Sequence, residues 1–280
     1  MKPVRILTVA GSDSGGGAGI QADLKTITVL GGFGMSVVTA LTAQNTLGVQ
    51  GIHDVPPAFV AAQFDAVATD IGIDAAKTGM LATSEVIRVV AERIRRYGIE
   101  KLVVDPVMVA KGGMALIREE AKKTLITELV PLAFVLTPNI PEAEVLSGMR
   151  ISTLSDMKEA ARIIRNLGAR HVVVKGGHLV GDAADLLYDG REFTIFNELR
   201  IETADTHGTG CTYSAAIATF LGRGMDVTGA VAKAKRYITE AIRCAWRVGG
   251  GHGPTNHLAP LFVPGAAGET GGPEGRKTVG

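Results

Sequence analysis

The feature that most constrains the fold of this chain is the alternation of short apolar runs with longer amphipathic stretches. The runs are largely continuous, as in strands that are buried on both faces. Because helical stretches separate them, the pattern predicts an α/β fold with right-handed βαβ units, in which helices cover both faces of a central, mostly parallel sheet. The expected strands are Val4–Ala10, Met35–Leu41, Lys101–Asp105, Phe134–Pro138 and His171–Lys175, with Asp74–Met80 as a less clear one.

Cap residues mark the ends of the expected helices. One helix is expected to have Thr83 or Ser84 as its N-cap and to end at Gly98. A second has Ser155 as its expected N-cap and ends at Gly168, and a long third helix is expected over residues 226–249. Such residues fix helix boundaries because they satisfy, or make room for, backbone groups that the helix leaves free.

The second half of the chain contains a hairpin signal and a tail. Asp189-Gly190 between two apolar runs predicts a β-hairpin. The chain has 280 residues, of which 46% are hydrophobic, so residues 1–263 are expected to form one domain with a sizeable core. Residues 264–280 are Gly-rich and poor in large apolar side chains, and we expect this tail to be disordered.

Charge and cysteine content limit the partners. The 29 basic and 28 acidic side chains give a formal net charge of +1, which favours neither a nucleic acid nor an anionic membrane as partner. The first apolar run is too short for a signal peptide or a membrane span. With only two cysteines a disulfide framework is not expected, and a cytoplasmic location fits best.

Polar residues gather after the expected strands, where parallel sheets bind their ligands. The Gly-rich loop after the first strand is not a dinucleotide fingerprint, because Ile20 stands where the third glycine would be needed. No P-loop motif is present either. The polar residues of these loops, which each taken alone could be a cap or a solvated residue, are Asp13, Asp23, Gln44, Lys77, Asp105, Lys111, Asn139, Glu142, Glu144 and Lys175.

The stretch DTHGTGCT, residues 205–212, carries the most specific local signal. Gly208 and Gly210 allow backbone N–H groups to point inward at a helix N-terminus, which predicts a site for an anion such as phosphate. The same field is expected to lower the pKa of Cys211 below its free value of about 8.5. A proton acceptor beside an anion hole suits phosphoryl transfer to an alcohol. The alternative is that Cys211 is a small core residue at a helix start.

Asn139 and Glu142 allow two interpretations. Their oxygens are suited to a hydrated Mg²⁺ beside a nucleotide phosphate. Equally, Asn139 would serve as the N-cap of a helix whose first turn contains Pro141 and Glu142. The local sequence does not choose between them. The six histidines are scattered, and no Cys/His cluster has the spacing of a zinc site.

Seven motifs in this order resemble one enzyme family: AGSDSGGGAGIQADLKT, TALTAQNTLGV, AAKTGM, VVDPVM, TPNIPEAEVL, VVVKGGH and DTHGTGCTYSAAIA. They are similar to the hydroxymethylpyrimidine/phosphomethylpyrimidine kinases of thiamine biosynthesis, which belong to the ribokinase-like superfamily. The resemblance extends from about Val4 to Leu261. It implies a sheet of about eight strands, a homodimer, and ATP and Mg²⁺. The implied reaction phosphorylates 4-amino-5-hydroxymethyl-2-methylpyrimidine and then its monophosphate.

The resemblance also assigns the substrate pocket. Gln44 would pair with the amino group and a ring nitrogen of the pyrimidine. Thr42 departs from a purely apolar pocket wall and would alter packing rather than remove activity. The residues implied to surround the ring are Gly11, Asp23, Thr42, Met80 and Val107.

Phosphate and metal contacts are assigned in the same way. The anion hole would comprise Gly208, Thr209, Gly210 and Cys211, with Cys211 in the place of the aspartate base of the superfamily's sugar kinases. ATP would meet Lys175, Asn139 and Thr209, and Mg²⁺ would be organised by Asn139, Glu142 and Asp105. The segment Ala110–Leu116 resembles a mobile flap of the family, in which Met114 is unusual.

Three other functions compete with this one. A pyridoxal kinase would share the fold and the cysteine, but pyridoxal lacks the amino group that a glutamine at position 44 would recognise. A thiol enzyme would need a base beside Cys211, and His207 lies four residues upstream. A pyrimidine-binding regulator would not need Lys175, Asn139 and Glu142 together with Cys211.

Overall fold

The computed structural model describes residues 3–109, 113–114, 116–177 and 183–262. Most of the expected flap over Ala110–Leu116 and the whole tail over 264–280 therefore lie outside the described residues. Within the described part of the chain, no helix has the combination of length and apolarity that a membrane span requires.

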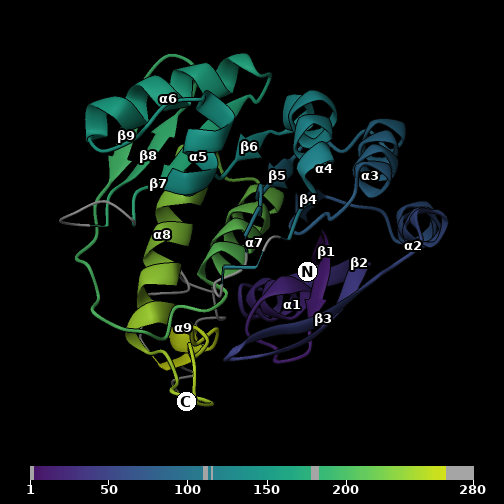
Figure 1. Cartoon of the computed structure of the whole chain (residues 1–280), viewed down its shortest axis with the longest axis horizontal. Coiled ribbons are helices and arrows are strands. Elements are labelled where there is room, and N and C mark those ends of the chain that lie inside the picture. The colour runs from purple at the N-terminus through teal and green to yellow at the C-terminus, as the bar shows by residue number, and fades with distance from the viewer. Residues whose placement is uncertain (1–2, 110–112, 115, 178–182, 263–280) are drawn as a thin grey trace, which may run out of the picture.

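The centre of the fold is a nine-stranded sheet with the order β3-β2-β1-β4-β5-β6-β7-β8-β9 (Figure 1). The pairs β1–β2, β1–β4, β4–β5, β5–β6 and β6–β7 are parallel, whereas β2–β3, β7–β8 and β8–β9 are antiparallel. The expected mostly parallel sheet is confirmed, with one strand more than the family resemblance implied. The strands are β1 (Val4–Asp13), β2 (Gly32–Asn45), β3 (Gly48–Asp54), β4 (Ala75–Thr78), β5 (Leu102–Val104), β6 (Val135–Leu136), β7 (His171–Lys175), β8 (Asp185–Tyr188) and β9 (Phe193–Phe196).

Helices cover both faces of the sheet, and two hydrophobic cores result. One core joins the sheet to α2, α3, α4, α5 and α6, and it contains Leu7 and Leu102. The other joins it to α1, α7 and α8, and it contains Ile6 and Val103. The helices are α1 (Gly19–Val29), α2 (Pro57–Asp70), α3 (Ser84–Arg96), α4 (Glu119–Thr124), α5 (Ile140–Ser147), α6 (Leu154–Asn166), α7 (Thr209–Gly222), α8 (Val227–Arg243) and α9 (Ala259–Phe262), with a π-helical turn at Leu125–Leu129 and a 3₁₀ turn at Val130–Leu132.

The order in which successive strands are added to the sheet reverses at β1, which lies between β2 and β4. The connection through α1 leads from β1 to β2 on one side, and β4 then returns to the other side of β1. A parallel sheet opens a crevice at the carboxyl ends of its strands where the order reverses, and ligands bind there. The segments after β1 and β4 therefore lie at the expected ligand crevice.

The expected helix boundaries at Thr83 and Gly98 agree with the structure, whereas the expected cap Ser155 differs and the helix expected over residues 226–249 ends at Arg243. The Thr83 side chain caps α3 by accepting a hydrogen bond from the backbone N–H of Val86. The helix α3 ends at Arg96, and Gly98, two residues later, has a φ of 60°. The expected cap Ser155 is wrong, because Thr153 caps α6 in a reciprocal capping box with Asp156. The Thr153 hydroxyl lies three residues before Asp156, and this spacing is the one that a capping box requires.

The hairpin β8–β9 was predicted from the sequence, and the edge strand β3 was not. The hairpin expected around Asp189-Gly190 is confirmed as the antiparallel pair β8–β9. The edge strand β3 was not expected, because its sequence GVQGIHD contains no apolar run and most of its residues are exposed. Its place in the sheet depends on backbone pairing with β2.

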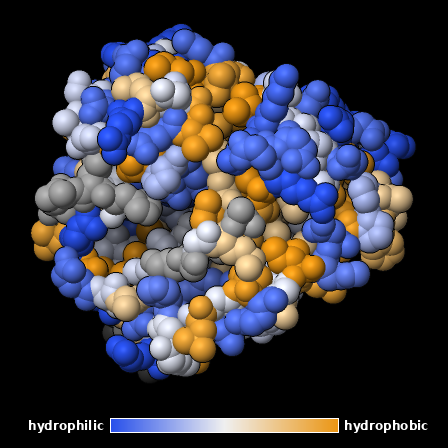
Figure 2. Space-filling view, viewed as in Figure 1, coloured by the Kyte–Doolittle hydropathy of each residue, from blue (hydrophilic) through white to orange (hydrophobic). Residues whose placement is uncertain are grey.

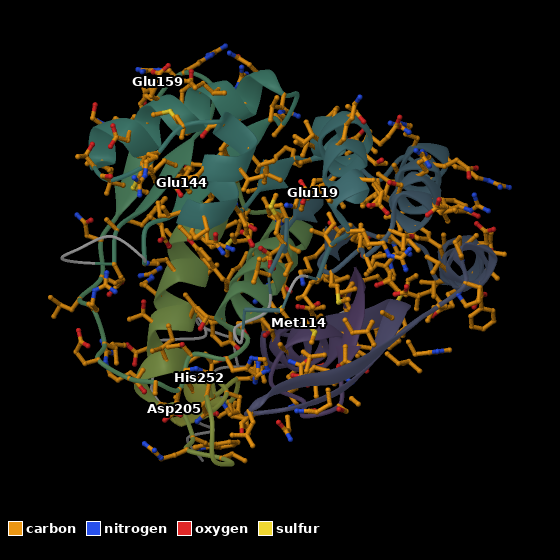
Figure 3. All side chains as sticks on the ribbon, in the orientation of Figure 1. Met114, Glu119, Glu144, Glu159, Asp205 and His252 are labelled. Carbon is orange, nitrogen blue, oxygen red and sulfur yellow. The ribbon has the colours of Figure 1, made fainter. Side chains whose placement is uncertain are left out.

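A glycine-rich segment, residues 249–253, connects parts of the chain that are far apart in the sequence. The backbone N–H groups of His252 and Gly251 donate to Thr46, to its carbonyl oxygen at 2.9 Å and to its hydroxyl at 3.2 Å. A Cβ atom at Gly251 would lie 2.0 Å from the Thr46 carbonyl oxygen, so no side chain fits there. The Gly253 N–H donates to Asp205, and Figure 3 shows Asp205 and His252 close together. The segment thus links the β2–β3 turn to the chain that enters α7.

A buried histidine shortly after this segment makes the free energy of unfolding depend on pH. His257 is 6% exposed, and its Nε2 lies 3.1 Å from Thr212 Oγ1. Burial, with a smaller contribution from the charge of Lys25, lowers the pKa of His257 from 6.5 to about 4. The unfolded chain therefore binds the extra proton first as the pH falls, and the stabilising contribution is complete above 6.5 and is lost between 6.5 and 4.

We expect this loss to reach about 3 kcal/mol of unfolding free energy. Urea unfolding at a series of pH values should show the wild type losing more stability between pH 7 and pH 4 than His257→Gln, which does not titrate. Parallel pH profiles for the two proteins would contradict the assignment.

Candidate active site

The N-terminus of α7 begins with a glycine whose position leaves no room for a side chain. Gly208 is the N-cap, with a φ of 78°, and a Cβ there would lie 1.8 Å from the carbonyl oxygen of Gly17. The close approach brings the loop after β1 against the start of α7. Thr209 opens the helix and donates its hydroxyl to the carbonyl oxygen of Thr206. Cys211 therefore lies in the first turn of a helix, as the sequence predicted.

An ion pair faces this helix start. Lys175 Nζ lies 2.9 Å from Asp105 Oδ1, and the Asp105 side chain is 2% exposed. The other carboxylate oxygen of Asp105 accepts a hydrogen bond from Ser214 on α7. A Cβ at Gly210 would lie 3.5 Å from Asp105 Oδ2 and 3.6 Å from Lys175 Nζ. The ends of β5 and β7 and the start of α7 thus meet, as the sequence predicted for these residues.

Asn139 and Glu142 form the cap of α5. The Asn139 side chain accepts from the backbone N–H of Glu142, and the Glu142 carboxylate accepts from that of Asn139, both at 2.9 Å. Glu142 is buried, and burial raises its pKa to about 7, although the charge of Lys175 opposes the rise. Of the two interpretations of this motif, the helix cap is present. The carboxyl group is nevertheless held within the electrostatic reach of Lys175 and Asp105.

The donor set of these loops fits a hydrated Mg²⁺. The described residues contain no group of three or more His, Cys, Asp or Glu side chains placed to hold a metal. Mg²⁺ does not need one, since it keeps several waters and takes one or two carboxylates together with substrate phosphates. Glu142 and Asp105 are two such carboxyl groups, both buried and both beside Lys175.

The expected lowering of the Cys211 pKa is wrong. Burial raises the pKa of this thiol to about 11, and neither the charge of Lys77 nor the N–H of Gly19 compensates for it. The carboxylates of Asp23 and Asp105 contribute in the same direction as burial. At neutral pH Cys211 is therefore a thiol, because loss of solvent and two nearby negative charges outweigh the field of the helix terminus.

A fully buried ion pair lies beneath the crevice. Lys77 Nζ lies 2.9 Å from Asp23 Oδ2, both side chains are 0% exposed, and Thr8 donates a hydrogen bond to the same oxygen. Burial lowers the pKa of Lys77, but the charge of Asp23, with a smaller contribution from Asp105, outweighs it and raises the pKa above its ordinary value. Asp23, predicted as a wall of the pyrimidine pocket, is thus occupied with Lys77, and its contact with a ring stays a prediction.

The other residues predicted for the pyrimidine pocket lie near or after the carboxyl ends of β1, β2, β4 and β5, and their contact with a substrate stays a prediction. Thr42 and Gln44 are half-buried on one face of β2, and Thr42 lies opposite Asp13 of β1. A Cβ at Gly11 would lie 3.1 Å from Met80 Sδ, so these two residues are in contact range. Val107, half-buried, follows β5. Met114, from the expected flap, is exposed, and Figure 3 labels it near the middle of the view.

Sequence reasoning missed the pairing of His207 with Asp13. His207 Nε2 lies 2.9 Å from Asp13 Oδ2, and the same carboxylate accepts from the backbone N–H groups of Gly15, Gly17 and Ala18. The loop after β1 is thereby fixed to the approach to α7. The ring nitrogen is engaged with a carboxylate, which weakens the alternative of a thiol enzyme with His207 as base. The only local signal was a histidine directly before the Gly-Thr-Gly turn.

Several known proteins are similar to this chain. The phosphomethylpyrimidine kinase family matches residues 13–256. A thiamine biosynthesis bifunctional protein of Geobacter sulfurreducens is 59% identical over 90% of this chain, although the chain spans 52% of that protein's length. The hydroxymethylpyrimidine/phosphomethylpyrimidine kinase of Bacillus subtilis is 49% identical, with 92% of this chain and 96% of that protein covered.

A solved structure shares the fold. The ADP complex of Bacillus subtilis pyridoxal kinase superposes with a TM-score of 0.88 at 41% identity, over 94% of this chain and all of that one. Taken with the sequence relatives, the match over residues 13–256 shows that the chain belongs to the phosphomethylpyrimidine kinase family.

Proposed function

We propose that this protein is an ATP-dependent kinase that phosphorylates 4-amino-5-hydroxymethyl-2-methylpyrimidine and then phosphorylates the monophosphate to the diphosphate, for thiamine biosynthesis. The observation that carries the proposal is the meeting of Gly210 with the Asp105–Lys175 pair at the start of α7. This arrangement offers backbone N–H groups and one ammonium to a phosphate that is being transferred. Phosphoryl transfer requires little more than such positioning, charge neutralisation and acceptance of one proton.

The residues divide the work as follows. Lys175 binds phosphate oxygens of ATP, with Asn139 and Thr209 beside it, and the N–H groups that follow Gly208 hold the transferred phosphoryl group. Cys211 accepts the proton of the substrate alcohol. Because its thiol is protonated at neutral pH, Cys211 first loses its own proton to solvent, and the thiolate then accepts the proton of the alcohol.

Mg²⁺ would be held by Glu142 and Asp105, with the backbone N–H of Asn139 fixing the Glu142 carboxyl group through the capping box. When bound, the ion would supply charge neutralisation at the nucleotide phosphates. Lys175 holds the Asp105 carboxylate in place at 2.9 Å. The raised pKa of Glu142, about 7, implies that its carboxyl group gives up a proton when a cation arrives.

Pyridoxal kinase activity is the second candidate, because the Bacillus subtilis pyridoxal kinase has the same fold at 41% identity. Gln44 favours the pyrimidine. Its amide offers one donor and one acceptor to the aminopyrimidine edge, and pyridoxal lacks the amino group. A site built to pair with a polar edge rejects an analogue that lacks it.

The test is product analysis by mass spectrometry after incubation with ATP, Mg²⁺ and hydroxymethylpyrimidine, with pyridoxal in a parallel reaction. The pyrimidine monophosphate followed by the diphosphate, with little pyridoxal phosphate, would support the proposal. Pyridoxal phosphate as the only product would refute it and favour the second candidate.

A homodimer in the cytoplasm is the expected setting. The edge of the sheet formed by β2 and β3 exposes Phe33, Leu41, Leu47 and Ile52, which is apolar area that a second copy would cover. Figure 2 shows hydrophobic residues forming a band across the middle of one face, between mostly hydrophilic margins. The two cysteines are both free, which suits a reducing compartment.

A further inference from the structure

The side chain of Gln44 ends between two hydrogen-bonding groups. Its terminal oxygen lies 3.1 Å from Thr42 Oγ1, and its terminal nitrogen lies 3.4 Å from His207 Nε2. The backbone of Gln44 is fixed by Ser14, whose hydroxyl hydrogen-bonds both its N–H and its carbonyl oxygen at 2.8 Å. The oxygen and nitrogen of an amide exchange places by a half-turn of its terminal torsion, so the neighbouring donors and acceptors decide which end lies where.

The neighbour on one side, His207, offers Gln44 no lone pair at Nε2, because that nitrogen carries a proton directed to Asp13. Its Nε2 lies 2.9 Å from Asp13 Oδ2. Burial raises the pKa of Asp13, but the hydrogen bonds from His207 and from the backbone of Ala18 and Gly15 outweigh it and bring the pKa below its ordinary value. The Asp13 group is therefore a carboxylate that accepts hydrogen bonds, and His207 Nε2 must carry the proton. An NH₂ group facing that nitrogen would set a donor against a donor.

The neighbour on the other side, Thr42, can only accept. Its Oγ1 lies 2.8 Å from the carbonyl oxygen of Ser12, closer than to Gln44. A carbonyl oxygen has no proton to give, so the single hydroxyl proton of Thr42 goes to Ser12. Only lone pairs remain on Thr42 Oγ1 for Gln44. The group that satisfies them is an amide NH₂.

We propose that Thr42 and the His207–Asp13 pair are positioning residues that hold the amide of Gln44 with its NH₂ towards Thr42 and its oxygen towards His207. This inference rests on the proposed function. The amide then donates to a ring nitrogen of the substrate on the Thr42 side and accepts from the 4-amino group on the His207 side. The orientation of the amide thus fixes which way round the aminopyrimidine edge binds.

The fixed orientation directs the alcohol towards the anion hole. In the pyrimidine, the carbon that carries the hydroxymethyl group is next to the carbon that carries the amino group, on the side away from the paired ring nitrogen. With the amino group on the His207 side, the hydroxymethyl group lies further in the same direction. The residues that follow His207 in the chain are Gly208–Cys211 at the start of α7. A half-turn of the amide would point the alcohol the other way.

Thr42→Val tests this assignment, because it keeps the shape of the side chain and removes the acceptor for Gln44. We expect kcat/KM for hydroxymethylpyrimidine to fall about tenfold, the effect of one hydrogen bond. For 5-hydroxymethyl-2-methylpyrimidine, which lacks the amino group and keeps only the ring nitrogen for the amide to pair with, kcat/KM should fall less, so the preference between the two substrates should shrink. Thr42→Ser, which retains a hydroxyl, should recover most of the loss.

The matched control is Gln44→Ala, which should raise the KM for the pyrimidine far more than the KM for ATP. In that background Thr42→Val should cost no further activity, because no amide is left to orient. Equal losses for both substrates, or the same loss with and without Gln44, would overturn the inference while the proposed function stood. A wild-type protein that phosphorylates neither pyrimidine would refute the proposed function and the inference with it.

Discussion

Cys211→Ala should lower kcat by about 10²–10⁴-fold while ATP still binds, because it removes the proton acceptor and leaves the glycine backbone of the anion hole intact. With a thiol pKa of about 11, the thiolate is about one part in ten thousand at pH 7. The wild-type kcat should therefore rise about tenfold per pH unit through the neutral and mildly alkaline range. In Cys211→Ala this alkaline rise should be absent.

Steady-state kinetics from pH 6 to pH 9, with ATP binding measured by calorimetry, would check both parts. The matched control is Cys244→Ala, at the other cysteine, which is partly buried and follows the end of α8. Its kcat and pH profile should resemble those of the wild type. Near-normal turnover in Cys211→Ala would remove this residue from the reaction and leave the substrate alcohol to lose its proton by another route.

Asp23→Asn should cost about 3–5 kcal/mol of unfolding free energy, because it leaves the ammonium of Lys77 buried without a counter-charge. Both side chains of this pair are 0% exposed. The double variant Asp23→Asn/Lys77→Met removes both charges and should recover most of the stability, since a neutral pair of similar volume carries no such desolvation penalty.

Urea unfolding of the wild type, the single variant and the double variant would measure this coupling. Glu159→Gln is the control, because it breaks an exposed ion pair with Arg162 on α6, a contact of the kind that contributes about 0–1 kcal/mol (Figure 3). A single variant that loses less than about 1 kcal/mol, or a double variant no more stable than the single one, would show that the pair is not held as tightly as its burial implies.

The part of the fold that could be predicted from the sequence is the part that burial determines. Ile6 and Leu7 belong to different cores on the two faces of the sheet, and this two-sided burial is what makes β1 a continuous apolar run. The strand β3 has no such signature, because it is exposed and held by backbone pairing alone. The cap of α6 was misplaced by two residues, since the sequence offers Thr153 and Ser155 and only the partner Asp156 distinguishes them.

The candidate site likewise has a part that the sequence predicts and a part that it does not. Residues such as Lys175 and Asp105 follow apolar runs, so their meeting at one edge followed from the parallel sheet. The pairing of Asp13 with His207 spans 194 residues of chain, and no local pattern records it. The pKa of Cys211 was misjudged because a helix terminus is visible in the sequence, whereas the burial of the thiol and its distance from two carboxylates are not.

The glycine-rich segment that contacts Thr46 has a consequence for the order in which the protein matures during synthesis. Its residues Gly251–Gly253 contact Asp205 and the turn after Gln44. The β2–β3 turn and the chain that enters α7 are therefore joined by one of the last described parts of the chain to be translated. The ribosome will have made all nine strands and the start of α7 before this connection can form. Chains that end before Gly251 lack this connection and should accordingly collapse without becoming active.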